Sequence, residues 1–406
     1  MNDFFPKRYT RLLISFAFIL SLSCEREATK SVFVEEQGGN PDPVINSIEP
    51  PNTGLAGIGV ITIKGSNFSS TLGDNAVFFG SIQAIVVSAS ESELVVQSPS
   101  VIADSLEVKV SVIGAFSFSN IIYYTLENAV DELGGYGVAG EDLYAIAVDA
   151  DENIYVYRSI RFIDLITPDT LDKNQPYGTA SIVTTGMKMG PGGYLYLVKG
   201  SNKNLYRIPP GGGNQSAFVR SLPDNLYDLD FDPVGNIYTA GDGDSITIVY
   251  PDGSFESVAG YTDTFIKAVR VFNGYVYVAG NMLGSLEAVW RNQINSPNSL
   301  GPNELVFDLT AELGEDIEIQ SLTFAEDGDM YIGTTADPDP IFIVHPDGSS
   351  EPLYPGVLAP EMYDMDWGND IYLYVSRRAS VIANTETRIM RINMQKKGAP
   401  YYGRSL

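Results

Sequence analysis

One short pattern recurs along residues 130–400 and constrains the fold more than any other feature of the sequence. An apolar residue followed by tyrosine comes after a turn rich in Gly, Asn or Asp, and the six tyrosines are Tyr155, Tyr196, Tyr238, Tyr277, Tyr331 and Tyr372. They are 41, 42, 39, 54 and 41 residues apart. An alternating strand precedes each pair, and a third and a short fourth strand follow it. Four strands per roughly 40 residues are typical of a β-propeller blade, so the repeats predict six blades.

Two places depart from the regular repeat of four strands. The longest interval holds a polar insertion at residues 291–304, which we expect to be a surface loop. The sixth repeat has a third strand at residues 388–393 but little sequence for a fourth. We therefore expect residues 127–133, just before the first blade, to supply the outer strand of blade six, because its edge would otherwise stay open.

The turns before the tyrosines carry a family resemblance. A strand is followed by Asp-x-x-Gly-Asn-hydrophobic-Tyr, as in residues 232–238, with related copies at residues 149–155 and 327–331. This pattern resembles the repeats of NHL-type propellers. The resemblance implies the propeller architecture and no particular activity, because this fold hosts unrelated functions.

The beginning of the chain has the layout of a secretory signal. Three basic residues precede an apolar run at residues 12–22, which is too short to span roughly 30 Å of hydrocarbon. The run ends just before Cys24, the only cysteine. This resembles a bacterial, Bacteroidetes-type lipoprotein signal, and implies a signal peptide over residues 1–23 and lipid attachment at Cys24. The alternative is an ordinary secretory signal with an incidental cysteine.

Residues 24–126 predict a tether and a small domain. Residues 24–42 are rich in Glu and Gly and are interpreted as a flexible tether. Residues 43–126 hold short alternating runs separated by turns, which is typical of a β-sandwich. The runs at residues 43–50 and 61–68 resemble the IPT/TIG family, which has an immunoglobulin-like fold. The resemblance implies a spacer or interaction module, and we find no catalytic constellation there.

The predicted fold class is therefore all-β, with an immunoglobulin-like sandwich followed by a six-bladed propeller over residues 127–400. The net charge of −26 argues against nucleic-acid binding, because phosphate backbones would be repelled. One cysteine and one histidine exclude cysteine-cluster zinc sites and sites with several His ligands. The lone His345 stands at a strand end and is interpreted as structural.

A set of charges is predicted inside the propeller channel, which the first strand of each blade lines. Counting back from the six tyrosines, with gaps in blades four and six, gives one comparable position per blade, and its residues are Ala147, Lys188, Asp230, Arg270, Thr323 and Asp366. The four charges cancel and stand between apolar neighbours. We interpret them as a belt of ion pairs that joins the blades; a site for a polar ligand or an ion is the alternative.

The start of the same strands predicts a candidate site at one mouth of the channel. Its residues are Tyr144, Tyr227, Asp228, Lys267, Tyr363 and Asp364. Tyrosine rings stack on sugars and carboxylates accept hydrogen bonds from hydroxyl groups, so this set suits a glycan. The alternative is that the tyrosines only pack between blades.

Calcium is possible but not located. Residues 149–153, 242–244 and 337–339 alternate oxygen-bearing side chains, but none matches a full EF-hand loop. We assign no catalytic residue and leave the metal site open. No Gly-x-Ser-x-Gly motif or phosphate-binding loop is present.

These observations predict a lipid-anchored protein of the bacterial outer membrane, on the cell surface. Its propeller would bind a polysaccharide or an envelope protein partner, with the sandwich as a spacer and no catalysis. One alternative is a calcium-dependent hydrolase or lactonase similar to gluconolactonase-type propellers, with Asp228 and Asp364 as its acids. The other alternative is a scaffold in an envelope complex.

Overall fold

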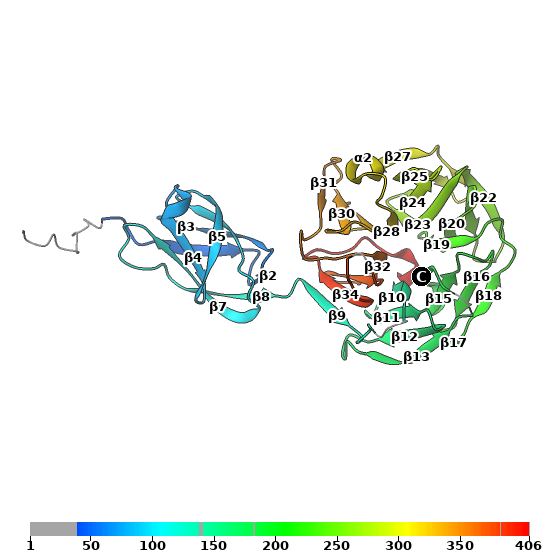
Figure 1. Cartoon of the computed structure of the whole chain (residues 1–406), viewed down its shortest axis with the longest axis horizontal. Helices are drawn as coiled ribbons and strands as arrows, with labels where there is room; N and C mark the ends of the chain where they lie inside the picture. The colour runs from blue at the N-terminus through cyan, green and yellow to red at the C-terminus, as the bar shows by residue number, and fades with distance from the viewer. Residues whose placement is uncertain (1–38, 138–140, 182, 382, 406) are drawn as a thin grey trace, which may run out of the picture. The chain divides into compact units, whose positions relative to one another are not determined.

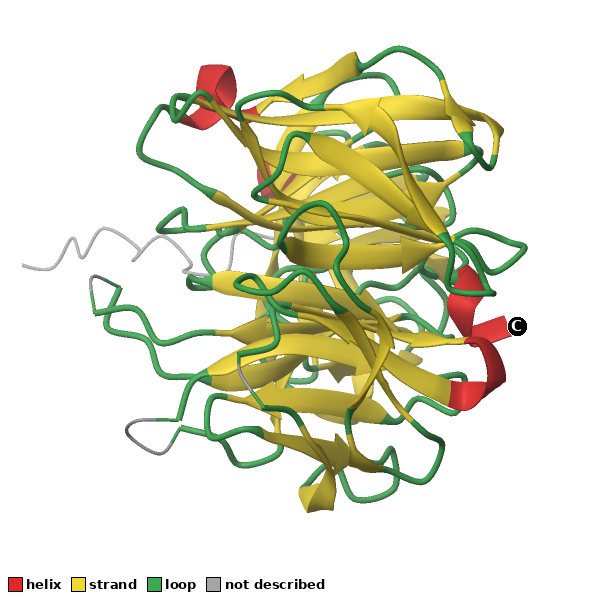
Figure 2. Cartoon of the chain, turned by 90° about the vertical axis from the view of Figure 1, so that its right-hand side faces the viewer, coloured by secondary structure: helices red, strands yellow, loops and turns green. Residues whose placement is uncertain are grey.

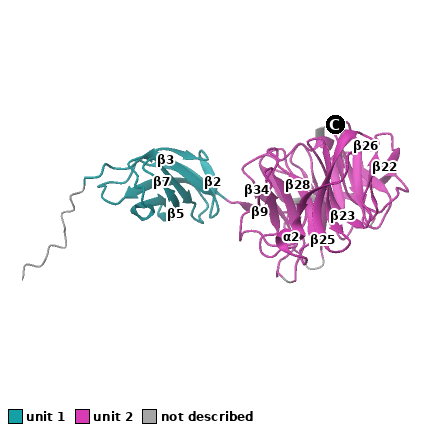
Figure 3. Ribbon diagram, turned by 90° about the horizontal axis from the view of Figure 1, so that it is seen from above, with its two compact units in different colours: residues 1–127 teal, residues 128–406 magenta. Residues whose placement is uncertain are grey.

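The computed structural model describes residues 39–137, 141–181, 183–381 and 383–405. The chain divides into two compact units, residues 1–127 and residues 128–406 (Figure 3). The expected signal peptide, Cys24 and most of the expected tether lie outside the described residues. In the described part of the chain, no helix has the length and apolar character needed to cross a membrane.

The first unit is a β-sandwich of eight strands (Figure 1). The hydrogen-bonded order is β1-β3-β6-β5-β4-β7-β8-β2, and β5 joins the two layers because it pairs with both β6 and β4. Alternate residues such as Ile61, Ile63, Val108 and Val110 point inward and are fully buried, which explains the period of two in the sequence. The strands are Val44–Glu49, Thr53–Leu55, Val60–Ser66, Asn75–Phe79, Ile82–Ala89, Glu93–Gln97, Ala103–Val112 and Ile122–Glu127 (β1 to β8), with a 3₁₀ turn at Leu72–Asp74.

The second unit is a ring of six sheets, in which all strand pairs but one are antiparallel. Blade one holds β10 (Leu143–Val148), β11 (Ile154–Arg158), β12 (Phe162–Ile166) and β13 (Lys173–Thr179), with the two-residue β17 (Gly213–Asn214) added at its edge. Blade two holds β14 (Gly186–Gly190), β15 (Tyr194–Val198), β16 (Leu205–Ile208) and β18 (Ser216–Val219). Blade three holds β19 (Leu226–Phe231), β20 (Ile237–Gly241), β21 (Ser245–Val249) and β22 (Phe255–Gly260).

The other half of the ring has the same plan. Blade four holds β23 (Thr264–Phe272), β24 (Tyr275–Met282), β25 (Leu286–Ser296), β26 (Ser299–Leu300) and β27 (Glu304–Asp308); blade five holds β28 (Ile319–Phe324), β29 (Met330–Thr334), β30 (Ile341–Val344) and β31 (Ser350–Pro352); blade six holds β32 (Met362–Trp367), β33 (Tyr372–Arg377) and β34 (Arg388–Asn393). A sandwich followed by a six-bladed propeller confirms the predicted all-β fold class.

Blade six is completed by the strand that precedes blade one. Strand β9 (Val130–Leu133) pairs antiparallel with β34, with Val130 opposite Ile392 and Leu133 opposite Ile389. Leu133 is 3% exposed and packs in the core shared by blades one and six. This confirms the expectation that a segment before the first repeat closes the last blade.

Three sequence expectations need correction. The insertion at residues 291–304 is not a surface loop, because β25 runs through its first half and turns back into β26 and β27. It is ordered by Asn292, which is fully buried and accepts a hydrogen bond from the Tyr261 hydroxyl at 2.6 Å. A short helix, α2 (Leu309–Leu313), interrupts the strands of the predicted all-β fold. In blade six, Tyr374 rather than Tyr372 stands opposite Asp366 and so occupies the repeated tyrosine position.

The Asp-x-x-Gly-Asn motif builds the turn between the first two strands of a blade. In blade three, one oxygen of Asp232 accepts hydrogen bonds from the Val234 and Asn236 amides, and the other accepts from the Asn236 side chain. Gly235 adopts a φ of 91°, a left-handed conformation that other residues rarely take. The motif therefore stabilises the turn between two strands, which explains why it recurs with the blades.

Candidate functional site

The first strands of five blades share one irregularity at the same height. A β-bulge interrupts the pairing near the start of each, and bulges re-aim side chains at the rims of sheets. They lie between Leu143 and Ile146, Leu226 and Asp228, Ile266 and Ala268, Ile319 and Ser321, and Met362 and Asp364. Four residues predicted for the channel mouth, Tyr144, Tyr227, Lys267 and Tyr363, stand at these bulges.

Aromatic rings and a cation meet on one side of this mouth. The rings of Tyr144 and Tyr363 are edge to face with centroids 5.2 Å apart. The guanidinium of Arg378 lies 5.0 Å from the Tyr144 centroid and 5.4 Å from the Tyr363 centroid. Tyr144 and Arg378 are partly exposed, whereas Tyr363 is buried beneath them. This side of the mouth therefore presents the Tyr144 ring beside an ion pair, because the Arg378 guanidinium lies 3.9 Å from the Glu361 carboxylate.

The other side of the mouth is polar. The Lys267 ammonium is 2.8 Å from a carboxylate oxygen of Glu318, and the Gln320 side chain donates to the same oxygen at 3.3 Å. Tyr227, which is partly exposed, packs edge to face on Phe265 with centroids 4.8 Å apart. Tyr227, Lys267 and Gln320 line the same small cavity at the mouth.

The two predicted carboxylates lie below this surface and are engaged in the fold. Asp228 accepts hydrogen bonds from the Val269 amide at 2.9 Å and from Arg270 at 2.7 Å. Asp364 accepts from the Ile146 amide at 2.9 Å and from its neighbouring amide at 2.8 Å. The cavity between them and the mouth holds about 10 Å³, roughly the space of one water molecule. A ligand of any larger size would lie on the mouth and would not reach these carboxylates.

The four predicted belt residues all stand opposite the repeated tyrosine position and are buried. The Lys188 ammonium lies 3.1 Å from Asp366, on another blade. Asp230 bonds no cation and instead accepts from the Phe231 and Val271 amides. Arg270 pairs with Asp228 and lies 3.7 Å from Asp364. Arg270 therefore joins the belt to the two carboxylates under the mouth.

An Asp-x-Asp pair in two blades ties neighbouring first strands together. In blade three, Asp228 and Asp230 accept from amides of β23 in blade four. In blade six, Asp364 and Asp366 accept from amides of β10 in blade one. The first strands of neighbouring blades do not belong to one sheet, and these carboxylates supply hydrogen bonds between them.

Burial controls the protonation of this network. It raises the pKa of Asp364 to about 7 and that of Asp230 to about 6. Burial alone would lower the pKa of Arg270, but Asp228 and its other neighbours raise it well above its usual range. Arg270 therefore stays charged, while Asp230 and Asp364 take up protons at a higher pH than exposed aspartates do.

The opposite end of the channel is closed by a segment that the sequence did not indicate. Residues 401–405, beyond the predicted end of the propeller, lie over the centre of the ring (Figure 1), and Figure 2 shows the 3₁₀ turn Tyr402–Ser405 at one face and α2 at the other. The Tyr401 hydroxyl is 2.7 Å from the Thr323 hydroxyl, and the Lys188 ammonium lies 4.6 Å from the Tyr401 ring centroid. Arg404 donates to the Trp367 carbonyl at 2.6 Å.

The carboxylates of the suggested calcium loops are already engaged in hydrogen bonds, since Asp242 accepts from the Asn225 side chain, Asp244 from the Asp263 amide and Asp339 from the Gly356 amide. Asp149 accepts from two backbone amides, the Asn153 side chain and the Tyr155 hydroxyl. Among the residues that the structure describes, no group of three or more His, Cys, Asp or Glu side chains is placed to hold a metal ion. His345 bonds Asp329 at 2.8 Å near a strand end.

Sequence reasoning missed Arg378, Glu318 and Phe265 at the mouth. Arg378 and Glu318 lie outside the first strands that were aligned, and Phe265 precedes the aligned positions. Arg378 directly follows the second strand of blade six, and Lys199 of blade two is the one basic residue at the same place in the other blades, so the repeats gave no signal for it.

A family model described as "IPT/TIG domain" matches residues 43–125. The first unit is an IPT/TIG domain. No curated protein matches the chain.

Several solved structures share the fold at low identity. An auxiliary nutrient binding protein from Bacteroides thetaiotaomicron has 13% identity and a TM-score of 0.54, covering 86% of this chain and 97% of the other. One from Bacteroides ovatus has 13% identity, a TM-score of 0.50 and the same coverage. A proposed gluconolactonase has 13% identity and a TM-score of 0.53, covering 67% of this chain and 93% of the other.

Proposed function

We propose that this protein is a lipid-anchored envelope protein that binds a glycan at the channel mouth of its propeller without catalysing a reaction. The lipid would be attached at Cys24 on the bacterial outer membrane, facing outward, and the IPT/TIG domain would act as the spacer. The single observation that carries the binding site is the set of bulges that aims Tyr144, Tyr227, Lys267 and Tyr363 at one mouth.

The chemistry of the mouth suits a saccharide. Tyrosine rings combine an apolar face with a polar edge, so they accept the C–H face of a sugar ring. The Lys267–Glu318 pair and Gln320 offer donors and acceptors for hydroxyl groups within the same mouth. The cavity at the mouth holds only about 10 Å³ and cannot enclose a small molecule, so the mouth fits a segment of a chain that lies across it better.

The state of the carboxylates supports binding over catalysis. A general acid or nucleophile must come within hydrogen-bond reach of the substrate. Asp228 and Asp364 accept hydrogen bonds from backbone amides and have about 10 Å³ of free space above them. The Bacteroides neighbours described as nutrient binding proteins make a binding role the closer parallel.

The test is affinity electrophoresis and calorimetry across a panel of neutral polysaccharides. We expect binding to at least one of them, with a loss of about tenfold or more for Tyr144→Ala and for Tyr227→Ala. Tyr123→Ala is the matched control, because Tyr123 is 63% exposed on the IPT/TIG domain. Loss of binding in the control variant, or equal binding in all variants, would contradict a site at the mouth; capture of an envelope protein with no glycan binding would favour a protein ligand.

A further inference from the structure

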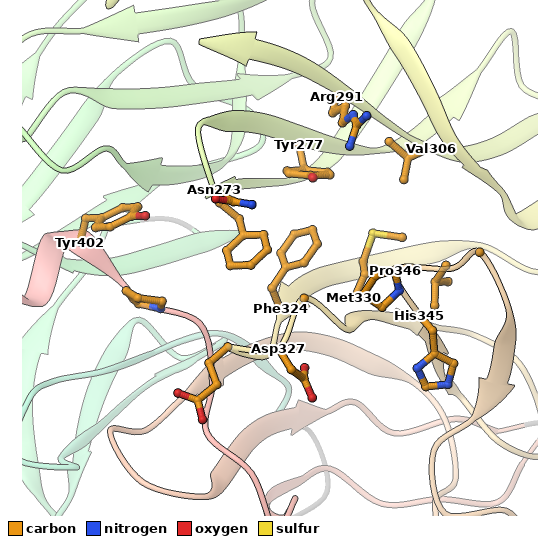
Figure 4. Close-up of a pocket in the computed structure, with 16 residues that line it drawn as sticks. Asn273, Tyr277, Arg291, Val306, Phe324, Asp327, Met330, His345, Pro346 and Tyr402 are labelled. Carbon is orange, nitrogen blue, oxygen red and sulfur yellow. The ribbon is translucent and has the colours of Figure 1, made fainter.

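A large cavity lies at the other end of the blades from the candidate mouth. It holds about 580 Å³ between blades four and five, within the range of roughly 300–1,000 Å³ that encloses small ligands (Figure 4). Phe272 and Phe324 end the first strands of these two blades and line it, whereas Lys267 and Gln320 at the mouth stand near the starts of the same strands. The two sites are therefore separated by the length of the first strands.

The floor of this cavity is aromatic. The rings of Phe272 and Phe324 are stacked, with centroids 4.7 Å apart and an interplanar angle of 14°. Tyr277 packs on Phe324 with centroids 4.6 Å apart. Phe272 is partly exposed, while Phe324 and Tyr277 are buried behind it. A rigid apolar platform is thus already in place.

The segment that closes the channel also supplies a wall of the cavity. Tyr402, which is partly exposed, and Pro400 line it (Figure 4). The Ala399 amide donates to the Phe324 carbonyl at 2.9 Å, and the Glu326 amide donates to the Lys397 carbonyl at 3.0 Å. The wall is therefore fastened to the strand that carries the floor.

The rim is polar and nearly neutral. Arg291 is paired with Glu304 at 2.9 Å and lies over the Tyr275 ring, and Asp327 is paired with Lys396 at 2.9 Å. Asn273 and Glu326 are exposed at the rim, so the side-chain amide of Asn273 and the carboxylate of Glu326 are accessible from the cavity. A cavity with an apolar floor and mixed donors and acceptors at its edge selects a neutral molecule with one apolar face.

We propose that this cavity is a second binding site that takes one or two units of a neutral saccharide. The sugar C–H face would lie on Phe272 and Tyr402, and its hydroxyl groups would bond Asn273 and Glu326. The net charge of −26 disfavours an anionic ligand. The choice of saccharides rests on the proposed function, but the site and its residues do not.

The test is calorimetry of the full chain with neutral disaccharides, namely maltose, cellobiose, xylobiose and mannobiose. We expect at least one of them to bind, with affinity lowered about tenfold by Tyr402→Ala and by Glu326→Gln and unchanged in Tyr227→Ala and Tyr123→Ala. Thermal unfolding of each variant reports whether the fold is kept; Glu326→Gln alters an exposed side chain and keeps the test open if Tyr402→Ala is unstable.

The outcomes separate the two proposals. Disaccharide binding that is lost in Tyr227→Ala and kept in Tyr402→Ala and Glu326→Gln would overturn the cavity site and leave the mouth intact. Disaccharide binding lost only in the cavity variants, with no polysaccharide binding that depends on Tyr144 or Tyr227, would overturn the mouth and support the cavity. Polysaccharide binding at the mouth with no disaccharide bound by the wild-type protein would overturn the cavity site alone.

Discussion

Replacing Arg270 with Met tests whether the channel network holds the propeller together. The Arg270 side chain is 3% exposed and its partner Asp228 is 7% exposed, with 2.7 Å between them. Arg270 also donates to the Met365 carbonyl at 3.2 Å, on a blade across the channel. The variant would leave Asp228 and Asp364 buried without their nearest cation.

The expected cost is large because the remaining charges cannot be solvated. Removing one partner of a buried ion pair costs about 3–5 kcal/mol of unfolding free energy. Adding Asp228→Asn removes the stranded charge, so we expect the double variant to recover a coupling energy of about 2 kcal/mol. The exposed pair Arg291–Glu304, with side chains 36% and 46% exposed, provides the control Glu304→Gln, whose cost we expect to be below about 1 kcal/mol.

Urea unfolding followed by tryptophan fluorescence measures the unfolding free energy of the propeller alone. Both tryptophans, Trp290 and Trp367, belong to the propeller and are 5% and 0% exposed. A loss for Arg270→Met no larger than that for Glu304→Gln would refute the reasoning, because it would mean that water reaches the network. Additive effects of Arg270→Met and Asp228→Asn would refute the pairing itself.

Three further predictions concern protonation, closure and anchoring. Burial raises the pKa of Asp230 from 3.8 to about 6, so the folded state favours the protonated form of this side chain. The resulting contribution to the unfolding free energy is fully present below about pH 4 and is lost as the pH rises through about 6. The unfolding free energy of the wild type relative to Asp230→Asn should therefore fall by about 3 kcal/mol between about pH 4 and about pH 8; a constant difference in urea titrations would contradict this. Deleting residues 129–133 should lower the thermal midpoint and cause self-association in light scattering, because β34 becomes an open edge; an unchanged midpoint would mean that β9 is dispensable. Cys24→Ala should abolish palmitate incorporation and release the protein from the membrane fraction, and label retained by the variant would rule out attachment at this residue.

The repeats were sufficient to predict the propeller, because each turn motif satisfies its own hydrogen bonds. Asp232 and Asn236 bond within one turn, so the sequence there reflects local geometry directly. The channel position could be aligned across blades for the same reason. In blade six the alignment used Tyr372 in place of Tyr374, because two tyrosines stand two residues apart and both follow apolar residues.

The partners of the aligned residues could not be predicted, since they depend on which blades face each other across the channel. Asp230 was expected to pair with a cation but bonds backbone amides. The closing segment around Tyr401 and the cavity beside Tyr402 were also missed, because that segment follows the last repeat and has no periodic pattern. Contacts made by unique segments leave no repeated signal.

The pairing of β9 with β34 also has a mechanical consequence. The chain leaves the IPT/TIG domain at Glu127 and enters β9 three residues later. Any pulling force transmitted along the chain through that domain therefore reaches the propeller at Val130 and must peel β9 from its neighbour before it strains another blade. Asp131 and Glu132 form ion pairs with Arg391 at 2.6 Å and Arg388 at 2.9 Å. These two ion pairs hold β9 on β34, the first pair of strands that a pulling force such as flow would separate in a tethered propeller.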